Sequence, residues 1–516
     1  MGFIRRRGFC TAAVAFVSTL ITSCFTQNSQ AWVPHIVSKG NKFFDSESGV
    51  EFRMKGVAYY PRPNDGELYK IDNYDWAADE HEDIWLPHLD KMQELGANTV
   101  RLYSVDPSKA HDKFMCACSE RGIYVLVGMA APCKNCAILD ALPPKCYPDD
   151  LFTRAQMVYN AFAVYDNTLG FSVGNENNLQ KLAGNKDGTS TAPCVKAFLR
   201  DVRRYASSCV GSMRAVPIGL DIADIPPRAL WLQYYDCSAD EDEHTRAEWI
   251  GFNPYVECNP KSHTKYSQSD GLKGLMKEYE QSEYPRPIMF GEFGCNLGDN
   301  TINGFEAQRQ FYDAKWMNEE KEMTDRIVGG NVFEFSTERK HVAGEKLSKK
   351  KDDGKYGIGY FQPDNCDHDA IPCKFVPYPE FENLKAAYTS TKNSTLKMSA
   401  FTPDHTKILK CPKNIDNKLQ PTPKVPYLKC SVAQPVCSGA KSNAFEKQPS
   451  KAIRMGEKKR PSNNLSGGGG ESSASNADLT PKKKADAMNG ADRSAHTAVS
   501  SAMAVVAAAT TLWLAL

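Results

Sequence analysis

The sequence predicts a (β/α)8 barrel over residues 32–395, followed by a disordered C-terminal stalk. Short β-rich runs alternate with helical patterns along the first part of the chain, and eight such runs fit within it. This alternation predicts parallel strands joined by helical crossovers. A doubly wound sheet is the structural alternative, but no glycine-rich phosphate-binding loop follows any of the runs. Eight strands in this length therefore favour the barrel.

The individual elements follow from residue type and from the spacing of apolar side chains. Leu86, Leu89, Met92 and Leu95 show the three-to-four spacing of a helix with one buried face. The eight expected strands are residues 53–59, 99–103, 124–128, 169–174, 215–219, 249–253, 287–291 and 331–335. The expected helices between them are residues 85–95, 109–121, 151–166, 195–208, 272–282 and 305–317.

The N-terminus has the pattern of a secretory signal. Three arginines, residues 5–7, precede an apolar stretch over residues 9–21, and Ser29-Gln30-Ala31 offers a small-x-small cleavage site. We therefore interpret residues 1–31 as a signal peptide. The alternative is an uncleaved membrane anchor, but the apolar run is shorter than the roughly 20 residues that a span needs.

The C-terminus has the pattern of a GPI-attachment signal. Small residues Asn489-Gly490-Ala491 are followed by a polar spacer and then by an apolar tail, residues 502–516. Residues 490–516 would be a propeptide, and residues 396–489, rich in Lys, Ser and Gly, a flexible stalk. A tail anchor is the alternative, although no basic residue follows the tail. We expect the mature protein on the outer face of the plasma membrane, held there by a GPI lipid anchor.

The net charge and the cysteine content indicate which class of protein this is and in which compartment it folds. The net charge of +1 lacks the basic excess of a nucleic-acid binder. The 17 cysteines indicate an oxidising compartment. Twelve of them, from Cys116 to Cys373, are enough for six bridges in the main domain, and the odd number after them leaves one thiol over. Cys133-x-x-Cys136 is expected to be a disulfide rather than part of a zinc site, because no second such pair occurs.

Two of the expected strands end in a glutamate, and these are the candidate catalytic residues. Glu176 follows Gly174-Asn175 at the end of the fourth strand, and Glu292 follows Gly291 at the end of the seventh. Catalytic side chains of a barrel project from the carboxyl ends of its strands, so the two glutamates can face each other. A retaining glycosidase needs such a pair, one as acid/base and one as nucleophile. The pattern alone leaves open whether both are catalytic.

Several segments, spread over about residues 52–362, occur in the same order and at the same spacing in a known family. They include Leu95-Gly96-Ala97-Asn98-Thr99-Val100-Arg101-Leu102-Tyr103, Gly174-Asn175-Glu176, Gly251-Phe252-Asn253-Pro254-Tyr255 and Gly291-Glu292-Phe293-Gly294-Cys295-Asn296. On these segments the sequence resembles the fungal β-1,3-glucanosyltransferases of glycoside hydrolase family 72. Members of that family are GPI-anchored enzymes that remodel the cell wall and have a (β/α)8 barrel.

The resemblance implies a role for each matching polar residue. Glu176 would be the acid/base and Glu292 the nucleophile. Asn175 would hydrogen-bond the sugar 2-hydroxyl, a contact that strengthens in the transition state. Tyr255, near the nucleophile, would orient its carboxylate.

Other matching residues are less specific. Arg101 and Tyr103 fall where the family places residues that shape the site. The alternatives are that Arg101 only pairs with a barrel carboxylate and that Tyr103 lies in the core. Tyr59 and Tyr255 are expected to stack on pyranose faces, whereas Trp76 is equally compatible with a core position.

The leading hypothesis is a retaining β-1,3-glucanosyltransferase, which cleaves an internal linkage of β-1,3-glucan and transfers the glycosyl fragment to another glucan chain. The alternatives are a retaining endo-β-1,3-glucanase and a non-catalytic glucan-binding surface protein. The expected partners are donor and acceptor glucan chains. We expect a monomer that uses no metal or other cofactor.

Overall fold

The computed structural model describes residues 33–431, apart from residues 72, 134, 139–145, 180–187, 259–262, 296–300, 303–305, 308 and 339–355. The expected signal peptide, the GPI-attachment segment and most of the expected stalk lie outside the described residues. Within the described part of the chain, no helix has the length and apolar character needed to cross a membrane.

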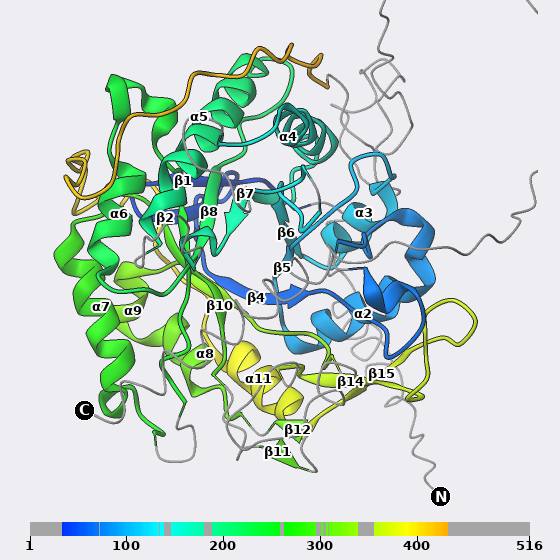
Figure 1. Cartoon of the computed structure of the whole chain (residues 1–516). Coiled ribbons are helices and arrows are strands. Elements are labelled where there is room, and N and C mark those ends of the chain that lie inside the picture. The colour runs from blue at the N-terminus through cyan, green and yellow to red at the C-terminus, as the bar shows by residue number, and fades with distance from the viewer. Residues whose placement is uncertain are drawn as a thin grey trace, which may run out of the picture.

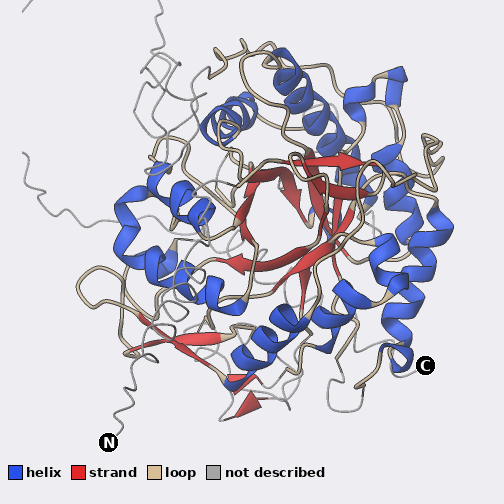
Figure 2. Ribbon diagram, turned by 180° about the vertical axis from the view of Figure 1, so that it is seen from behind, coloured by secondary structure: helices blue, strands red, loops and turns tan. Residues whose placement is uncertain are grey.

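Eight parallel strands close into a barrel, which confirms the predicted fold (Figures 1 and 2). In order around the barrel they are β4 (Met54–Tyr59), β5 (Thr99–Leu102), β6 (Tyr124–Gly128), β7 (Thr168–Asn175), β8 (Ile218–Ala223), β9 (Ile250–Asn253), β10 (Ile288–Phe293) and β13 (Gly329–Val332). Almost all strand residues are buried, because helices cover the outside and side chains fill the inside. The strands therefore occur as continuous apolar runs, which is why they could be recognised in the sequence.

Helices surround the barrel (Figure 2). In the first of them, Trp85, Leu89, Met92 and Leu95 form the buried face, and the helix ends where Gly96 takes a φ of 75°. The helices are α2 (Glu82–Leu95), α3 (Asp112–Glu120), α4 (Asp149–Phe162), α5 (Ala192–Ser208), α6 (Arg228–Asp236), α7 (Asp270–Ser282), α8 (Tyr312–Glu319), α9 (Lys321–Arg326) and α11 (Pro379–Ser390). The helix expected over residues 305–317 begins only at Tyr312. Helices α6, α9 and α11 were not expected.

A small antiparallel sheet closes the N-terminal end of the barrel. It consists of β1 (Ile36–Lys39), β2 (Lys42–Asp45) and β3 (Glu51–Phe52). Ile36 and Phe43 of this sheet pack against apolar side chains near the starts of the barrel strands, among them Met54, Tyr124 and Trp249. The carboxyl ends of the strands therefore form the barrel mouth. Two short hairpins, β11 (Thr301–Ile302) with β12 (Glu306–Ala307) and β14 (Gly359–Gln362) with β15 (Lys374–Pro377), lie at the edge of the molecule (Figure 1).

Disulfides correct the expected boundary between barrel and stalk. Cys209–Cys430 and Cys237–Cys411 join α5 and α6 to the segment that follows residue 395. This segment runs past these helices through residue 431 (orange in Figure 1). Its backbone also accepts hydrogen bonds, for example at the Asp416 carbonyl from Tyr234. A flexible stalk starting at residue 396 is therefore wrong for residues 396–431.

The remaining cysteines follow the expectation only in part. The Cys133–Cys136 disulfide is confirmed. Three more bridges lie within the main domain: Cys146–Cys194, Cys258–Cys295 and Cys366–Cys373. The unpaired thiol of the described chain is Cys118, which is buried on α3 rather than placed in the tail. The twelve cysteines of the main domain therefore do not pair only with one another.

Candidate active site

Three of the predicted side chains converge on Glu292, a buried residue of β10. The Arg101 guanidinium and the Tyr103 hydroxyl each donate to Oε1 at 2.8 Å. The Tyr255 hydroxyl donates to Oε2 at 2.8 Å. Three donors, one of them a cation, stabilise the ionised form of the carboxylate. Glu292 thus has the surroundings of an anionic nucleophile.

The Arg101 guanidinium joins the two sides of the barrel mouth. Its Nη2 donates to Oδ1 of Asn175 at 2.8 Å and lies 3.1 Å from Oδ2 of Asp221. Burial alone would lower the pKa of Arg101, but Asp221, Tyr103 and Glu292 together raise it above its ordinary value. Arg101 therefore both pairs with barrel carboxylates, as one reading of the sequence proposed, and lies within the site.

Glu176 lies directly after β7 and has a positive φ of 53°, a strained conformation of the kind that clusters at active sites. The Nδ2 of Asn253, on β9, donates to Glu176 Oε1 at 2.8 Å. Burial and, next, the neighbouring Glu292 carboxylate raise the pKa of Glu176 to about 8. The two carboxyl groups thus differ in their surroundings, as a general acid and a nucleophile must.

Comparison with known proteins shows which family the chain belongs to. The family model described as Glucanosyltransferase matches residues 25–357, which is more than half of the chain. The chain belongs to this family.

Known glucanosyltransferases are similar in sequence to most of this chain. The 1,3-beta-glucanosyltransferase gel1 of Aspergillus fumigatus is 29% identical over 384 residues, which cover 74% of this chain and 72% of that protein. The 1,3-beta-glucanosyltransferase GAS5 of Saccharomyces cerevisiae is 30% identical over 381 residues, covering 73% and 67%. Among solved structures, Saccharomyces cerevisiae Gas2p in complex with laminaritriose and laminaritetraose matches with a TM-score of 0.58 at 27% identity, covering 76% of this chain and 77% of that chain.

In this glucanosyltransferase, Tyr59 is not a site residue, and its prediction as a sugar-stacking side chain is wrong. It is only 2% exposed. Its hydroxyl bonds to Nδ1 of His88 on α2 at 2.9 Å, and its ring packs edge-on against Phe335. Trp76 is also buried, at 3% exposure. Neither ring has a face that a pyranose could reach.

Two residues of the site were not singled out from the sequence. Asn253, the partner of Glu176, ends β9 within Gly251-Phe252-Asn253-Pro254-Tyr255, so its position at a strand end was the available signal. Asp221, the partner of Arg101, lies in β8. The fifth strand was expected to end at residue 219, but β8 extends to Ala223. Had the expected strand extended to residue 223, Asp221 would have been recognised as a carboxylate near the barrel mouth.

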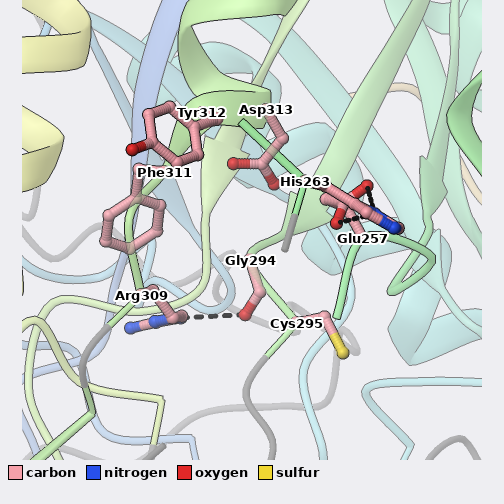
Figure 3. A pocket seen from close by; sticks show the side chains of 8 residues that line it. All are labelled: Glu257, His263, Gly294, Cys295, Arg309, Phe311, Tyr312 and Asp313. Atoms are coloured by element: carbon pink, nitrogen blue, oxygen red, sulfur yellow. Dashed lines mark hydrogen bonds and ion pairs between the residues drawn. The ribbon is translucent and has the colours of Figure 1, made fainter. Parts of the chain in front are cut away.

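A small pocket lies beside the end of β10 (Figure 3). Its lining residues are Glu257, His263, Gly294, Cys295, Arg309, Phe311, Tyr312 and Asp313. His263 Nδ1 is 2.9 Å from Glu257 Oε1, and Arg309 donates to the Gly294 carbonyl at 2.9 Å. Neither catalytic candidate lines the pocket, and the described residues contain no cluster of three metal-ligating side chains. The pocket adjoins the glucanosyltransferase site without being part of it.

Proposed function

We propose that this glucanosyltransferase is a retaining enzyme for β-1,3-glucan, with Glu292 as nucleophile and Glu176 as acid/base. The observation that carries the proposal is the contrast between the two carboxyl groups. Glu292 accepts hydrogen bonds from a guanidinium and two hydroxyls, whereas Glu176 accepts one from a neutral amide and has a raised pKa. The names of the similar proteins, and the laminari-oligosaccharides bound to Gas2p, support β-1,3-glucan as the substrate.

In the first displacement, ionised Glu292 attacks the anomeric carbon of an internal β-1,3 linkage. Protonated Glu176 gives its proton to the glycosidic oxygen as the bond to the leaving chain breaks. A covalent glycosyl-enzyme forms, and the fragment on the reducing-end side departs. Asn175, held by Arg101, is placed to hydrogen-bond the sugar 2-hydroxyl as charge develops in the transition state.

In the second displacement, Glu176 acts as a base. Its carboxylate takes the proton from a hydroxyl of an incoming glucan chain, and that oxygen attacks the anomeric carbon. Glu292 leaves as a carboxylate, and Glu176 is protonated again. Two inversions give overall retention of the β-configuration. Transfer dominates over hydrolysis when the acceptor hydroxyl is held in attack geometry at a high effective concentration.

The experiment that tests this proposal follows product lengths by mass spectrometry, using a laminari-oligosaccharide tagged at its reducing end. We expect products longer than the substrate from the wild-type protein and none from Glu292→Gln. In Glu176→Ala, added azide should restore turnover of a laminari-oligosaccharide donor whose aryl leaving group needs no acid, and should give a β-glycosyl azide, because azide needs no base to attack the glycosyl-enzyme. Glu120→Gln, at the solvent-exposed end of α3, is the matched control and should behave as wild type.

Each contrary outcome points to a different function. Only shorter products would make the protein an endo-β-1,3-glucanase. Unchanged substrate, with binding indifferent to Glu176→Gln and Glu292→Gln, would make it a glucan-binding protein without activity. An α-glycosyl azide would overturn the retaining mechanism.

We also propose that the protein is secreted, carries a GPI anchor, acts at the cell wall and is a monomer. The disulfides of the described chain support an oxidising compartment. Release of the protein from cells by a phosphatidylinositol-specific phospholipase would test the anchor.

A further inference from the structure

Asp221 of β8 contacts both halves of the site while touching no position that a sugar could reach. Its side chain is fully buried, at 0% exposure. Its Oδ2 lies 3.1 Å from Nη2 of Arg101 and accepts a hydrogen bond from the Ser172 hydroxyl at 2.7 Å. Its backbone carbonyl accepts the N–H of Glu176 at 3.0 Å. One residue therefore holds the cation that contacts Glu292 and the main chain that carries Glu176.

The neighbouring strands leave room for this carboxylate by carrying glycine. A Cβ at Gly251, on β9, would lie 2.1 Å from Asp221 Oδ1. A Cβ at Gly291, on β10, would lie 2.3 Å from the same oxygen. Both distances are far below van der Waals contact, so any side chain at either position would displace Asp221. The space around the carboxylate thus depends on residues from two other strands.

We propose that Asp221 is a positioning residue for glucanosyl transfer, which fixes Arg101 between Asn175 and Glu292 and holds the backbone of Glu176 in place. This inference rests on the proposed roles of the two glutamates.

The physical reason is the geometry of the guanidinium. Arg101 donates from Nη1 to Glu292 Oε1 and from Nη2 to Asn175 Oδ1, so both contacts depend on the orientation of one planar group. Asp221 is its buried ionic partner and contacts Nη2, the nitrogen that also donates to Asn175. Without that partner the guanidinium can rotate in its plane, and Glu292 loses alignment with the anomeric carbon. A misplacement of about 1 Å costs on the order of 100-fold in rate.

The first test compares Asp221→Ala with Asp221→Asn in the full-length protein, using initial rates of transfer on laminari-oligosaccharides. We expect kcat to fall about 100-fold in Asp221→Ala, with KM nearly unchanged, because the substrate contacts remain. In Asp221→Asn the amide oxygen can still accept hydrogen bonds from Arg101 and Ser172. This variant should therefore recover much of the lost kcat. A role in folding alone would lower the melting temperature without this separation of kcat from KM.

A matched control is Asp236→Asn on α6. Asp236 is also fully buried and pairs with Arg246 at 2.7 Å, but it lies outside the barrel mouth. We expect this variant to melt at a lower temperature and to keep the wild-type kcat. Equal kcat values for Asp221→Ala and Asp236→Asn, with Glu292→Gln inactive, would overturn the inference and leave the proposed function intact. A fully active Glu292→Gln would overturn the proposed function itself.

A second test uses Gly251→Ala. In the wild-type background the added Cβ should push Asp221 away and lower kcat. In the Asp221→Ala background the clashing oxygen is gone, so Gly251→Ala should lower kcat little further. If the two substitutions instead lower kcat by the product of their separate effects, Gly251 acts independently of Asp221 and the inference is contradicted.

Discussion

At the scale of the residue, the barrel gives two chemically identical side chains different surroundings. The carboxylate of Glu292 is surrounded by donors that favour its charge, whereas Glu176 is placed near a like charge with one neutral donor. These surroundings come from strands far apart in the sequence. The resulting pH dependence can be tested one contact at a time.

The hydrogen bond from Asn253 is the first such contact. Because the proposed first displacement needs a protonated Glu176, we expect kcat/KM to fall as pH rises through about 8, the pKa of Glu176. The Asn253 amide favours the ionised form and holds this pKa down. Asn253→Ala should therefore move the fall in kcat/KM to higher pH, measured from pH 5 to 10. A shift to lower pH would contradict the assignment of Glu176 as the acid.

The two tyrosines on Glu292 should differ in importance. Among the described residues, Tyr255 is the only hydrogen-bond donor to Oε2, whereas Oε1 keeps Arg101 if Tyr103 loses its hydroxyl. A hydrogen bond to a charged group contributes about 1.5–3 kcal/mol. We expect kcat to fall roughly 10- to 100-fold in Tyr255→Phe and less in Tyr103→Phe. Equal losses, measured by initial transfer rates, would show that the two oxygens of Glu292 are equivalent.

At the scale of the element, the start of α8 contains a carboxyl group that opposes folding. Burial raises the pKa of Asp313 from 3.8 to about 7, and Glu257 adds to this effect, while the Ala314 N–H and Arg309 oppose it. Between about pH 4 and 7 the folded protein holds a proton that the unfolded chain has lost, so stability falls as pH rises through this window.

Asp313→Asn should remove this penalty. We expect the variant to melt above wild type at pH 8 and close to it at pH 4, as followed by circular dichroism. Asp270→Asn, at a side chain that is 95% exposed, is the control for the loss of a carboxylate at the surface. A constant difference at all pH values would mean that Asp313 does not titrate in this range.

The elements also show how far sequence reasoning reaches. Barrel strands could be predicted because burial on both faces makes them continuous apolar runs. Because both faces are buried, the sequence does not show which side chains point into the barrel and which point out toward the helices. For that reason Tyr59, which contacts α2, was misplaced. Helix α11 carried a readable pattern in Phe381, Leu384 and Tyr388, all buried, yet it was not predicted. The start of α8 could not be read, because Phe311 before it takes a positive φ of 53° that no local pattern signals.

Both glutamates could be predicted because each lies at or just after the carboxyl end of a strand and close to a glycine. Their partners were harder to find. Asp221 was missed because the expected strand was too short at its end, and Asn253 because a lone amide has no distinctive pattern. The contact between Asn253 and Glu176 joins residues 77 positions apart and exists only once the barrel closes.

At the scale of the whole molecule, residues 396–431 stabilise the outer layer of helices. The Cys237–Cys411 and Cys209–Cys430 bridges span 174 and 221 residues. A disulfide that closes a long loop reduces the entropy of the unfolded chain more than one that closes a short loop. On this effect alone, each of these bridges contributes about 5 kcal/mol to the free energy of unfolding. Cys366–Cys373, which spans 7 residues, restricts it far less.

A chain ending at residue 395 should therefore be less stable than one ending at residue 431, although both contain the complete barrel. The shorter chain loses both long-range bridges and leaves Cys209 and Cys237 without partners. We expect its melting temperature to fall by many degrees, and the Cys237→Ser, Cys411→Ser double variant of the longer chain to fall part of the way. Removing Cys366–Cys373 in the same manner should lower the melting temperature less.

Equal melting temperatures for the two chain lengths would show that the barrel is stable without this segment. The transfer rate of molecules that remain folded should stay near wild type, because the Cys237–Cys411 bridge lies on the outer helices and touches neither glutamate.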